Sequence, residues 1–228
     1  MQLKKWSELP SYMKTKEVKK YYDIIKRRQL SLLFKRIFDV IASVIMLLVL
    51  APFMIVLMIM IKLDSKGPVF FRQERVTQYG RIFRIFKFRS MVNNAERYGV
   101  QVTVVGDARI TKVGAMLRKL RIDELPQLIN ILNGDMTFVG TRPEVKKYVD
   151  CYTNEMYATL LLPAGLTSRT SIEYKDEDKL LEGAVDINKA YIEKVLPVKM
   201  KYNLKNVKHF SFFSDIMTML ATFFAVLK

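Results

Sequence analysis

The longest uninterrupted apolar pattern in the sequence covers residues 40–61, where 22 consecutive positions carry no charged side chain. A helix needs about 20 apolar residues to reach across a bilayer core, so this run predicts a membrane segment. The run begins after 39 residues and is followed by Lys62 and Leu63 rather than by small residues. A cleaved signal peptide is therefore not expected, because its apolar region is shorter and ends in small residues.

The two flanks of this run are both basic. Residues 1–36 contain 11 Lys and Arg against 3 acids, and residues 62–91 contain 8 against 2. Basic flanks favour the cytoplasm, so a straight span would carry one of them to the wrong side. A break at Ala51 and Pro52 would solve this, since proline removes a helical hydrogen bond. We therefore predict a re-entrant helix-break-helix over residues 35–66; a kinked spanning helix is the alternative.

The two ends of the chain also carry amphipathic patterns. Residues 1–34 combine many lysines with Trp6 and several tyrosines, which is typical of an extension that lies on a bilayer surface. A flexible basic extension is the alternative. Residues 210–228 are apolar at helical spacing but contain Asp215. Since a charge makes a second span unfavourable, we expect an amphipathic helix that packs or lies at the interface.

Residues 67–209 are predicted to form the part of the protein outside the membrane. Residues 69–91 alternate aromatic and β-branched residues with basic ones around a turn signal at 78–80, which predicts a β-hairpin. Its density of arginine and lysine indicates that some of them meet anions, although solvated side chains explain many of them. With the helical segments, the prediction is an α+β fold that is mostly helical.

Residues 107–134 predict two helices separated by a break that carries Asp123 and Glu124 before Pro126. Acids at this place are ordinary helix-capping residues. However, Arg118 lies one turn away, and the start of a helix can hold phosphate and lower the pKa of a carboxyl group. We therefore also interpret Asp123 as a candidate ionised nucleophile. A rigid turn then places Arg142, which suits bidentate phosphate binding.

Composition narrows the function classes. The formal net charge of +16, with 50% hydrophobic residues and a mean hydropathy of +0.08, points to an anionic membrane surface. Nucleic-acid binding would explain only the charge, and no base-stacking or zinc motif supports it. A single Cys151 and a single His209 exclude a disulfide framework, a histidine metal cluster and a Ser-His-Asp triad with a spare base. Chemistry must therefore rest on carboxylates, lysine or tyrosine.

Several motifs in a fixed order carry a resemblance to a known family. In chain order they are Lys35-Arg36-Ile37-Phe38-Asp39, the proline-broken run, Gly67-Pro68-Val69-Phe70-Phe71 with Gln73 and Arg75, Lys87-Phe88-Arg89-Ser90-Met91, Asp123-Glu124-Leu125-Pro126-Gln127-Leu128, Gly134-Asp135-Met136, and Phe138-Val139-Gly140-Thr141-Arg142-Pro143-Glu144. From about residue 35 to the C-terminus the chain resembles the bacterial sugar transferases, and more narrowly the monotopic phosphoglycosyl transferases in their minimal catalytic form.

The resemblance implies transfer of a sugar-1-phosphate from a UDP-sugar to polyprenol phosphate, such as undecaprenyl phosphate, with release of UMP. In the family the Asp of the Asp-Glu pair forms a covalent phosphosugar intermediate, which corresponds to Asp123, while Glu124, with Asp123, would hold Mg²⁺. Family arginines and a basic strand-end motif near the phosphates correspond to Arg118, Arg142, Lys87 and Arg89. The expected location is the cytoplasmic face of the bacterial inner membrane, in contact with lipid, and self-association is left open.

The chain departs from the family pattern at three places. Ala51 replaces the usual serine before the membrane proline, Thr141 replaces the first proline of Pro-Arg-Pro, and residues 163–168 diverge before an acidic stretch. The last departure leaves the sugar unassigned. A non-enzymatic adaptor that binds anionic lipid is the alternative function, although it does not explain an acidic pair set between arginines.

Overall fold

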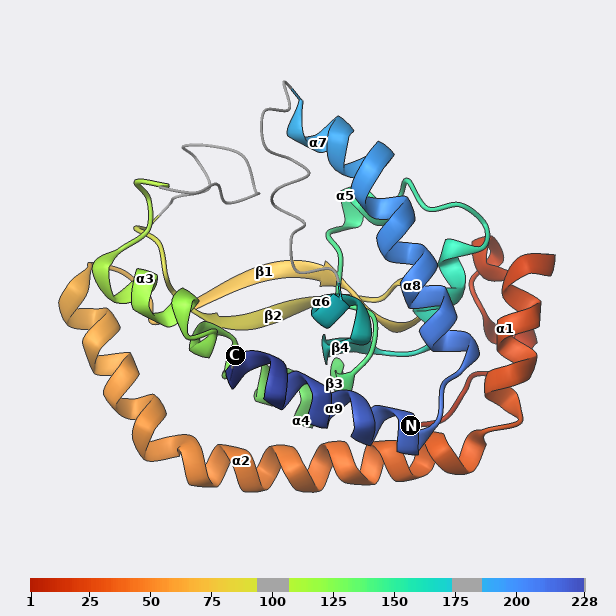
Figure 1. The fold of residues 1–228 in the computed structure, drawn as a ribbon, viewed down its shortest axis with the longest axis horizontal. Coiled ribbons are helices and arrows are strands. Elements are labelled where there is room, and N and C mark those ends of the chain that lie inside the picture. The colour runs from red at the N-terminus through yellow and green to blue at the C-terminus, as the bar shows by residue number, and fades with distance from the viewer. Residues whose placement is uncertain (94–106, 174–185, 228) are drawn as a thin grey trace.

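The computed structural model describes residues 1–93, 107–173 and 186–227. One very long helix follows the edge of the molecule, and the remaining elements pack within its curve (Figure 1). In chain order the main elements are α1 (Lys16–Lys26), α2 (Gln29–Asp64), β1 (Phe70–Val76), β2 (Ile82–Phe88), α3 (Lys112–Lys119), the 3₁₀ turn η5 (Ile122–Glu124), α4 (Gln127–Asn133), β3 (Met136–Val139), α5 (Lys146–Val149), η6 (Met156–Leu161), β4 (Ala164–Thr167), α6 (Arg169–Glu173), α7 (Ile187–Ala190), α8 (Leu196–Lys208) and α9 (Phe212–Leu227). The described residues are thus mostly helical with little strand, as predicted.

Helix α2 contains the predicted apolar run and is long and apolar enough to cross a membrane. Its 36 residues correspond to a length of about 54 Å at 1.5 Å per residue. Only 17% of its most apolar window is buried, so it is not an ordinary core helix. Pro52 lies inside the helix. The predicted interruption at Ala51 and Pro52 is not confirmed: the helix continues through both residues, and its C-terminal part bends away from the line of its first part (Figure 1).

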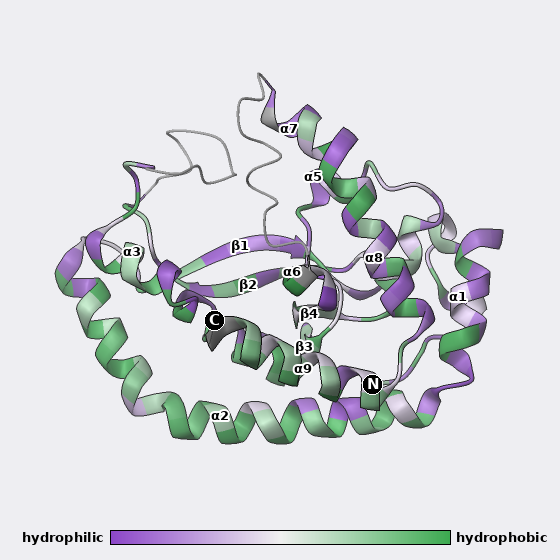
Figure 2. Ribbon diagram, in the orientation of Figure 1, coloured by the Kyte–Doolittle hydropathy of each residue, from purple (hydrophilic) through white to green (hydrophobic). Residues whose placement is uncertain are grey.

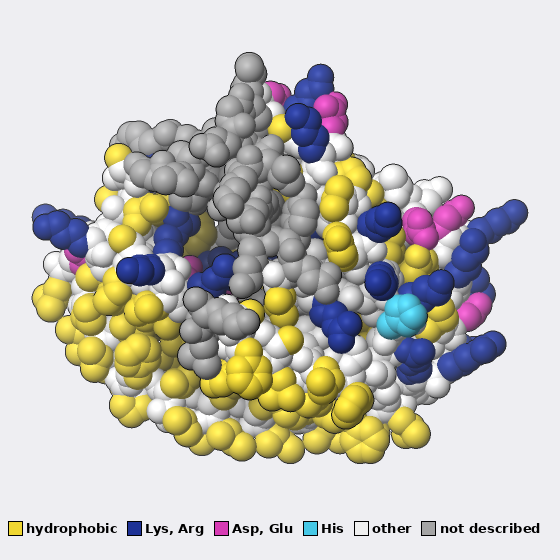
Figure 3. Space-filling view, in the orientation of Figure 1, with side chains coloured by type: hydrophobic (Ala, Val, Ile, Leu, Met, Phe, Trp, Pro, Cys, Tyr) yellow, Lys and Arg dark blue, Asp and Glu magenta, His cyan; other side chains and the backbone are white. Residues whose placement is uncertain are grey.

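The exposed apolar side chains of α2 and α9 gather along one edge of the molecule. Figure 2 shows both helices as mainly hydrophobic, and Figure 3 shows apolar side chains collected along the edge that α2 forms. The exposed members include Leu30, Leu33, Phe34, Ile37, Ile41, Ile45, Leu48, Val49, Phe53, Ile55, Val56, Ile59 and Leu63 in α2, and Phe213, Met217, Leu220, Phe223 and Phe224 in α9. A patch of this extent marks an interaction surface rather than scattered exposure.

The N-terminal extension packs on the protein. Leu9, Met13, Val18 and Ile25 are at most 3% exposed, and they share a core with residues of η6 and α8. Helix α1 is amphipathic, but its apolar side contacts η6 and α8. The predicted arm on the bilayer surface therefore differs from the structure, because this apolar face is already covered by protein.

The predicted hairpin forms from β1 and β2, which pair antiparallel with Phe71 opposite Lys87. A second, parallel pair joins β3 to β4, which was not predicted. Backbone contact at its end is very close, since a Cβ atom on Gly165 would lie 2.2 Å from the Gly140 nitrogen. The acidic stretch expected after residue 171 lies mostly outside the described residues.

Candidate active site

Strand β2 carries Lys87 to the site. Phe83 and Ile85 are buried in the core formed with α4, and Lys87 continues the same face of the strand. At that end of β2 the neighbouring element is η5, which contains Asp123 and Glu124. On this face of β2, Phe83 and Ile85 therefore make apolar contacts in the core, whereas Lys87 contacts the acidic pair.

The acidic pair is presented by a tight turn rather than by a helix start. Arg121 precedes η5 in the left-handed region with φ of 55°, and α4 begins only at Gln127. Asp123 is therefore not the N-cap of α4, which corrects the capping interpretation. The end of α4 is as predicted, with Gly134 in the left-handed conformation that closes a helix.

Glu124 is held by two cations. Lys87 Nζ donates to its Oε1 at 2.8 Å, and Arg142 donates to both carboxylate oxygens, with Nη1 at 3.2 Å from Oε2. The Glu124 side chain is 20% exposed. A planar guanidinium that grips both oxygens fixes a carboxylate in orientation as well as position. Arg142, from the turn after β3, and Lys87, from the end of β2, thus bind the same carboxylate.

The charges in this cluster stabilise each other. Burial alone would raise the pKa of Glu124, but Arg142 and then Lys87 hold the pKa of this carboxyl well below its ordinary value. In return, the charge of Glu124 raises the pKa of the Arg142 guanidinium. Glu124 is therefore ionised at any pH at which the protein would work.

Asp123 is in a different state. Within residues 1–93, 107–173 and 186–227, no other residue forms a hydrogen bond or an ion pair with its side chain, and only its own backbone N–H acts on the carboxylate as a hydrogen-bond donor. Burial raises the pKa of the Asp123 carboxyl, Lys87 opposes the rise, and the charge of Glu124 adds to it. Arg118 in α3 also acts on it and lowers the pKa. This contradicts the expectation that a helix start lowers the pKa of Asp123. A half-buried carboxylate without a bound partner is more basic, and so a better nucleophile once ionised.

Comparisons with known proteins identify the family of the chain. Residues 30–228 match the family described as bacterial sugar transferase. The chain is 30% identical to exopolysaccharide production protein ExoY of Rhizobium meliloti, over 84% of each chain. The chain belongs to the bacterial sugar transferase family.

Other relatives of this chain are longer. It is 38% identical to the UDP-N-acetylgalactosamine-undecaprenyl-phosphate N-acetylgalactosaminephosphotransferase of Aeromonas hydrophila, over 85% of this chain and 43% of that protein. It is 39% identical to the UDP-glucose:undecaprenyl-phosphate glucose-1-phosphate transferase of Klebsiella pneumoniae, over 58% of this chain and 27% of that protein. The chain thus spans less than half the length of these two relatives.

Of the basic residues expected at the phosphates, the structure brings Lys87 and Arg142 onto Glu124 and places Arg118 near Asp123. Arg89 lies elsewhere. It is 5% exposed and donates to the Ile61 carbonyl at 3.2 Å and to the Ser65 carbonyl and hydroxyl at 2.6 and 2.9 Å. It therefore closes the C-terminal end of α2, although it is only two residues from Lys87.

The residues around the acidic pair bear on the Mg²⁺ that the resemblance implies. Among the described residues there is no group of three His, Cys, Asp or Glu side chains that could hold an ion. Mg²⁺ often binds through one or two carboxylates together with substrate phosphates, and it does not need a cage of protein ligands. The Asp123-Glu124 pair fits that mode, in which phosphate oxygens of a bound molecule would supply the remaining ligands.

Sequence reasoning left Gln73 and Arg75 without a role. Arg75 Nη2 donates to Gln73 Oε1 at 2.7 Å, and both residues share the β1 face that pairs with Lys87. Burial lowers the pKa of the Arg75 guanidinium, Glu144 opposes this, and Arg142 adds to it. A second guanidinium thus lies near Arg142. The period-two pattern of β1 and its pairing with β2 would have revealed this shared face.

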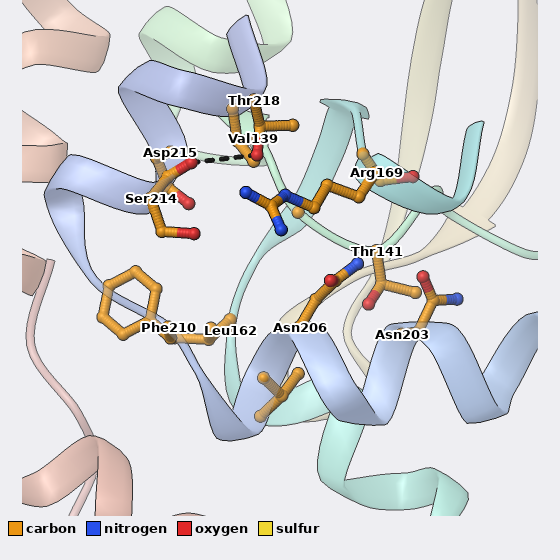
Figure 4. Close-up of a pocket in the computed structure, with 13 residues that line it drawn as sticks. Val139, Thr141, Leu162, Arg169, Asn203, Asn206, Phe210, Ser214, Asp215 and Thr218 are labelled. Carbon is orange, nitrogen blue, oxygen red and sulfur yellow. Dashed lines mark hydrogen bonds between the residues drawn. The ribbon is translucent and has the colours of Figure 1, made fainter. Parts of the chain in front are cut away.

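A separate cavity lies behind the turn that carries Arg142. It encloses about 480 Å³ including its open mouth, and residues of β3, α6, α8 and α9 line it. In Figure 4 the Arg169 side chain extends into this cavity toward Ser214 and Asp215. Gly140 and Thr141 line it from the other side. The lining includes Gly140 and Thr141, which lead to Arg142, but it includes neither Arg142 nor Glu124.

Proposed function

We propose that this sugar transferase moves a sugar-1-phosphate from a UDP-sugar to a polyprenol phosphate, such as undecaprenyl phosphate, and so begins the assembly of a membrane-linked glycan such as a capsule, exopolysaccharide, O-antigen or glycoprotein glycan. One observation carries the proposal. Two adjacent carboxylates share a cationic cluster, and one is clamped by Lys87 and Arg142 while the other has no partner from another residue in the described part of the chain. The clamped acid suits charge balance, and the free acid suits attack on phosphorus.

The reaction proceeds in two displacements at the same phosphorus atom. The Asp123 carboxylate forms a bond to the β-phosphorus, the bond from that phosphorus to the bridging oxygen breaks, and UMP leaves with the electron pair. An oxygen of polyprenol phosphate then attacks the phosphosugar on Asp123 and releases the carboxylate. Lys87, Arg118 and Arg142 offset the charge of the transferred phosphoryl group and its leaving group.

We expect Mg²⁺ to bind at Glu124 and Asp123 together with the phosphates of the substrate. When bound, the ion neutralises negative charge on the diphosphate and orients it. Glu124 keeps its charge for this role because Arg142 and Lys87 stabilise the ionised carboxylate. Chelation with EDTA should therefore stop turnover, and added Mg²⁺ should restore it.

The membrane arrangement that we propose is re-entry of α2 into the cytoplasmic leaflet of the bacterial inner membrane. Both ends of the helix are bonded to the same globular part. Arg36 near its start donates to the Ile131 carbonyl at 2.7 Å, and Asp64 at its end accepts from the Val113 nitrogen at 3.0 Å. A straight span would hold these two ends on opposite sides of a membrane about 30 Å thick. The bend in α2 and the shared attachment support a monotopic arrangement.

Cysteine labelling tests this topology. In a Cys151→Ser background, the exposed positions Gln29 and Lys66 flank α2 and each can be changed to cysteine. A membrane-impermeant maleimide applied to sealed vesicles should reach both positions from the cytoplasmic side and neither from the other side. Opposite accessibility of the two positions would refute re-entry, without any bearing on the chemistry at Asp123.

The activity test is UMP release by the purified protein with a panel of UDP-sugars, Mg²⁺ and undecaprenyl phosphate. Asp123→Asn should abolish turnover while membrane association is retained, and Glu124→Gln should be severely impaired. Asp150→Asn is the matched control, because Asp150 is an exposed acid paired with Lys146. A phosphosugar adduct on Asp123 should be found by mass spectrometry when the lipid acceptor is omitted. Undiminished turnover by Asp123→Asn would contradict the nucleophile assignment, and lipid binding without turnover by the wild type would favour an adaptor.

A further inference from the structure

Three charged residues near the start of α2 face the protein rather than the bilayer. Lys35 is 3% exposed and Asp39 is 1% exposed, although the helix around them is apolar and largely uncovered. Lys35 and Asp39 are four residues apart and so lie on the same side of the helix. Arg36 lies beside them. Buried charges rarely add stability over apolar residues of similar volume. Stability therefore does not explain why Lys35 and Asp39 are buried here.

Lys35 and Asp39 bind three consecutive residues of β3. Lys35 Nζ donates to the Val139 carbonyl at 2.7 Å and to Asp215 Oδ2 of α9 at 2.5 Å. The Asp39 carboxylate accepts from Thr137 Oγ1 at 2.8 Å and from the Phe138 nitrogen at 3.2 Å. Val139 and Asp215 both line the cavity drawn in Figure 4. One side of β3 is therefore held by the membrane-facing helix.

The strand held in this way leads directly to the catalytic turn. Val139 is followed by Gly140, Thr141 and Arg142, and Arg142 grips Glu124. On the other side the Gly140 nitrogen donates to the carbonyl of Thr167, the last residue of β4, at 3.0 Å. The turn thus has two supports, one from β4 and one from α2.

The element that follows the acidic pair is tied to α2 as well. Arg36 donates to the last carbonyls of α4, those of Ile131 and Leu132, at 2.7 and 2.9 Å. Helix α4 begins three residues after Glu124. Arg142 and Glu124 are the two partners of the clamp. The same stretch of α2 therefore holds both the segment that follows Glu124 and the strand that precedes Arg142.

We propose that Lys35 and Asp39 are positioning residues of the active site, which hold β3 so that the Arg142 guanidinium meets Glu124 at a fixed place relative to the bilayer-facing helix. The structural part of this proposal stands alone, and only the expected effect on turnover rests on the proposed function. The acceptor phosphate arrives from the membrane and the donor from solution, so the acidic pair must keep a defined position with respect to α2. A misplacement of about 1 Å can lower a rate about 100-fold.

The test separates positioning from packing with the double variant Lys35→Met with Asp215→Leu. This variant replaces a buried ion pair by apolar side chains, which preserves or improves stability in many proteins, but it removes the bond to the Val139 carbonyl. We expect kcat for UMP release to fall about tenfold or more with KM within about twofold, as for a loss of active-site alignment. Deuterium exchange of a peptide covering residues 136–142 should become faster while the thermal midpoint is retained.

Two further variants complete the experiment. Asp39→Asn keeps the shape of the side chain and weakens its hydrogen bonds to β3. It should therefore lower kcat and speed exchange at residues 136–142, each to a smaller extent than in the double variant. This variant carries the test if the double variant does not fold. Phe34→Ala removes one of the two ring contacts between α2 and Phe212 of α9, and the ring contact of Phe38 with Phe212 remains. It should leave both kcat and exchange at residues 136–142 unchanged.

Wild-type kcat and exchange in the double variant, or the same losses in Phe34→Ala, would overturn the positioning role. If the wild type releases no UMP with any donor, the proposed function fails, and the exchange measurement alone then decides whether α2 holds the turn.

Discussion

Removing the Arg142 side chain tests the clamp on Glu124 directly. In Arg142→Met the two hydrogen bonds from the guanidinium are lost, and Glu124 keeps only Lys87 at 2.8 Å. The methionine is close in length, so packing of the stem is largely retained. The variant therefore isolates the charge and the hydrogen bonds from the bulk of the side chain.

The expected loss of stability follows from exposure. A hydrogen bond to a charged group contributes about 1.5–3 kcal/mol when buried. Here the side chains of Arg142 and Glu124 are 40% and 20% exposed, so solvent screening reduces the effect. With Lys87 still in place, we expect a decrease in the free energy of unfolding of about 1–2 kcal/mol. For a domain of this size that corresponds to a fall in Tm of roughly 2–8 °C.

The pH dependence gives the sharper readout. Although burial alone raises the pKa of Glu124, Arg142 is the largest of the influences that depress this pKa in the folded protein. A depressed carboxyl pKa contributes stability above the unfolded value of about 4.3, and this stability is lost as the pH falls through the folded pKa. The difference in Tm between wild type and Arg142→Met should therefore be full at pH 7 and shrink below about pH 4.

The assay is thermal unfolding of both proteins in the same detergent from pH 7 to pH 3.5. The control is Arg81→Met, which removes an ion pair to Asp135 at 2.7 Å from a side chain that is 53% exposed. Such a surface pair contributes at most about 1 kcal/mol. A difference for Arg142→Met that stays constant across this pH range would show that Arg142 acts through packing, and the electrostatic reasoning about Glu124 would be refuted.

Three further predictions concern separate parts of the molecule. Because burial raises the pKa of Asp123, kcat should fall on the acid side at a pH above the ordinary Asp value of about 3.9, as a pH profile of UMP release will show; an acid limb below that value would contradict it. Met13→Ala should cost about 2–5 kcal/mol in denaturant unfolding, since Met13 is fully buried, whereas exposed Lys14→Ala should cost little. Arg89→Met should loosen the end of α2, seen as faster deuterium exchange at residues 61–66, with little change in KM for the donor; an unchanged exchange rate would count against its capping role.

The sequence predicted those parts of the fold that depend on local pattern. The apolar run of α2, the hairpin of β1 and β2, the closure of α4 at Gly134 and the amphipathic helix α9 all follow from spacing and turn residues. The pairing of β3 with β4 could not be predicted this way. Four-residue strands separated by 24 positions carry too little pattern to indicate a partner.

For the candidate site, the sequence indicated residue types and positions but not the charge state or the partners of each residue. The order of motifs indicated the acidic pair and the basic residues around it, whereas the opposite pKa shifts of Asp123 and Glu124 depend on contacts that neighbouring positions do not reveal. Lys87 and Arg89 look equivalent in the sequence. In the structure their partners differ at the end of β2, because Lys87 binds Glu124 whereas Arg89 binds Ser65 at the end of α2.

By itself, the sequence determined the class of the protein: an apolar run with basic flanks, and an acidic pair among cations, because these depend on residue types along the chain. The tertiary structure decided which charges meet. Residues separated by about a hundred positions, such as Lys35 and Val139, come into contact only when helix and strand pack, and the covered face of the N-terminal extension likewise depends on its partners in η6 and α8. Burial and pairing of charge are properties of packing, and no local pattern specifies them.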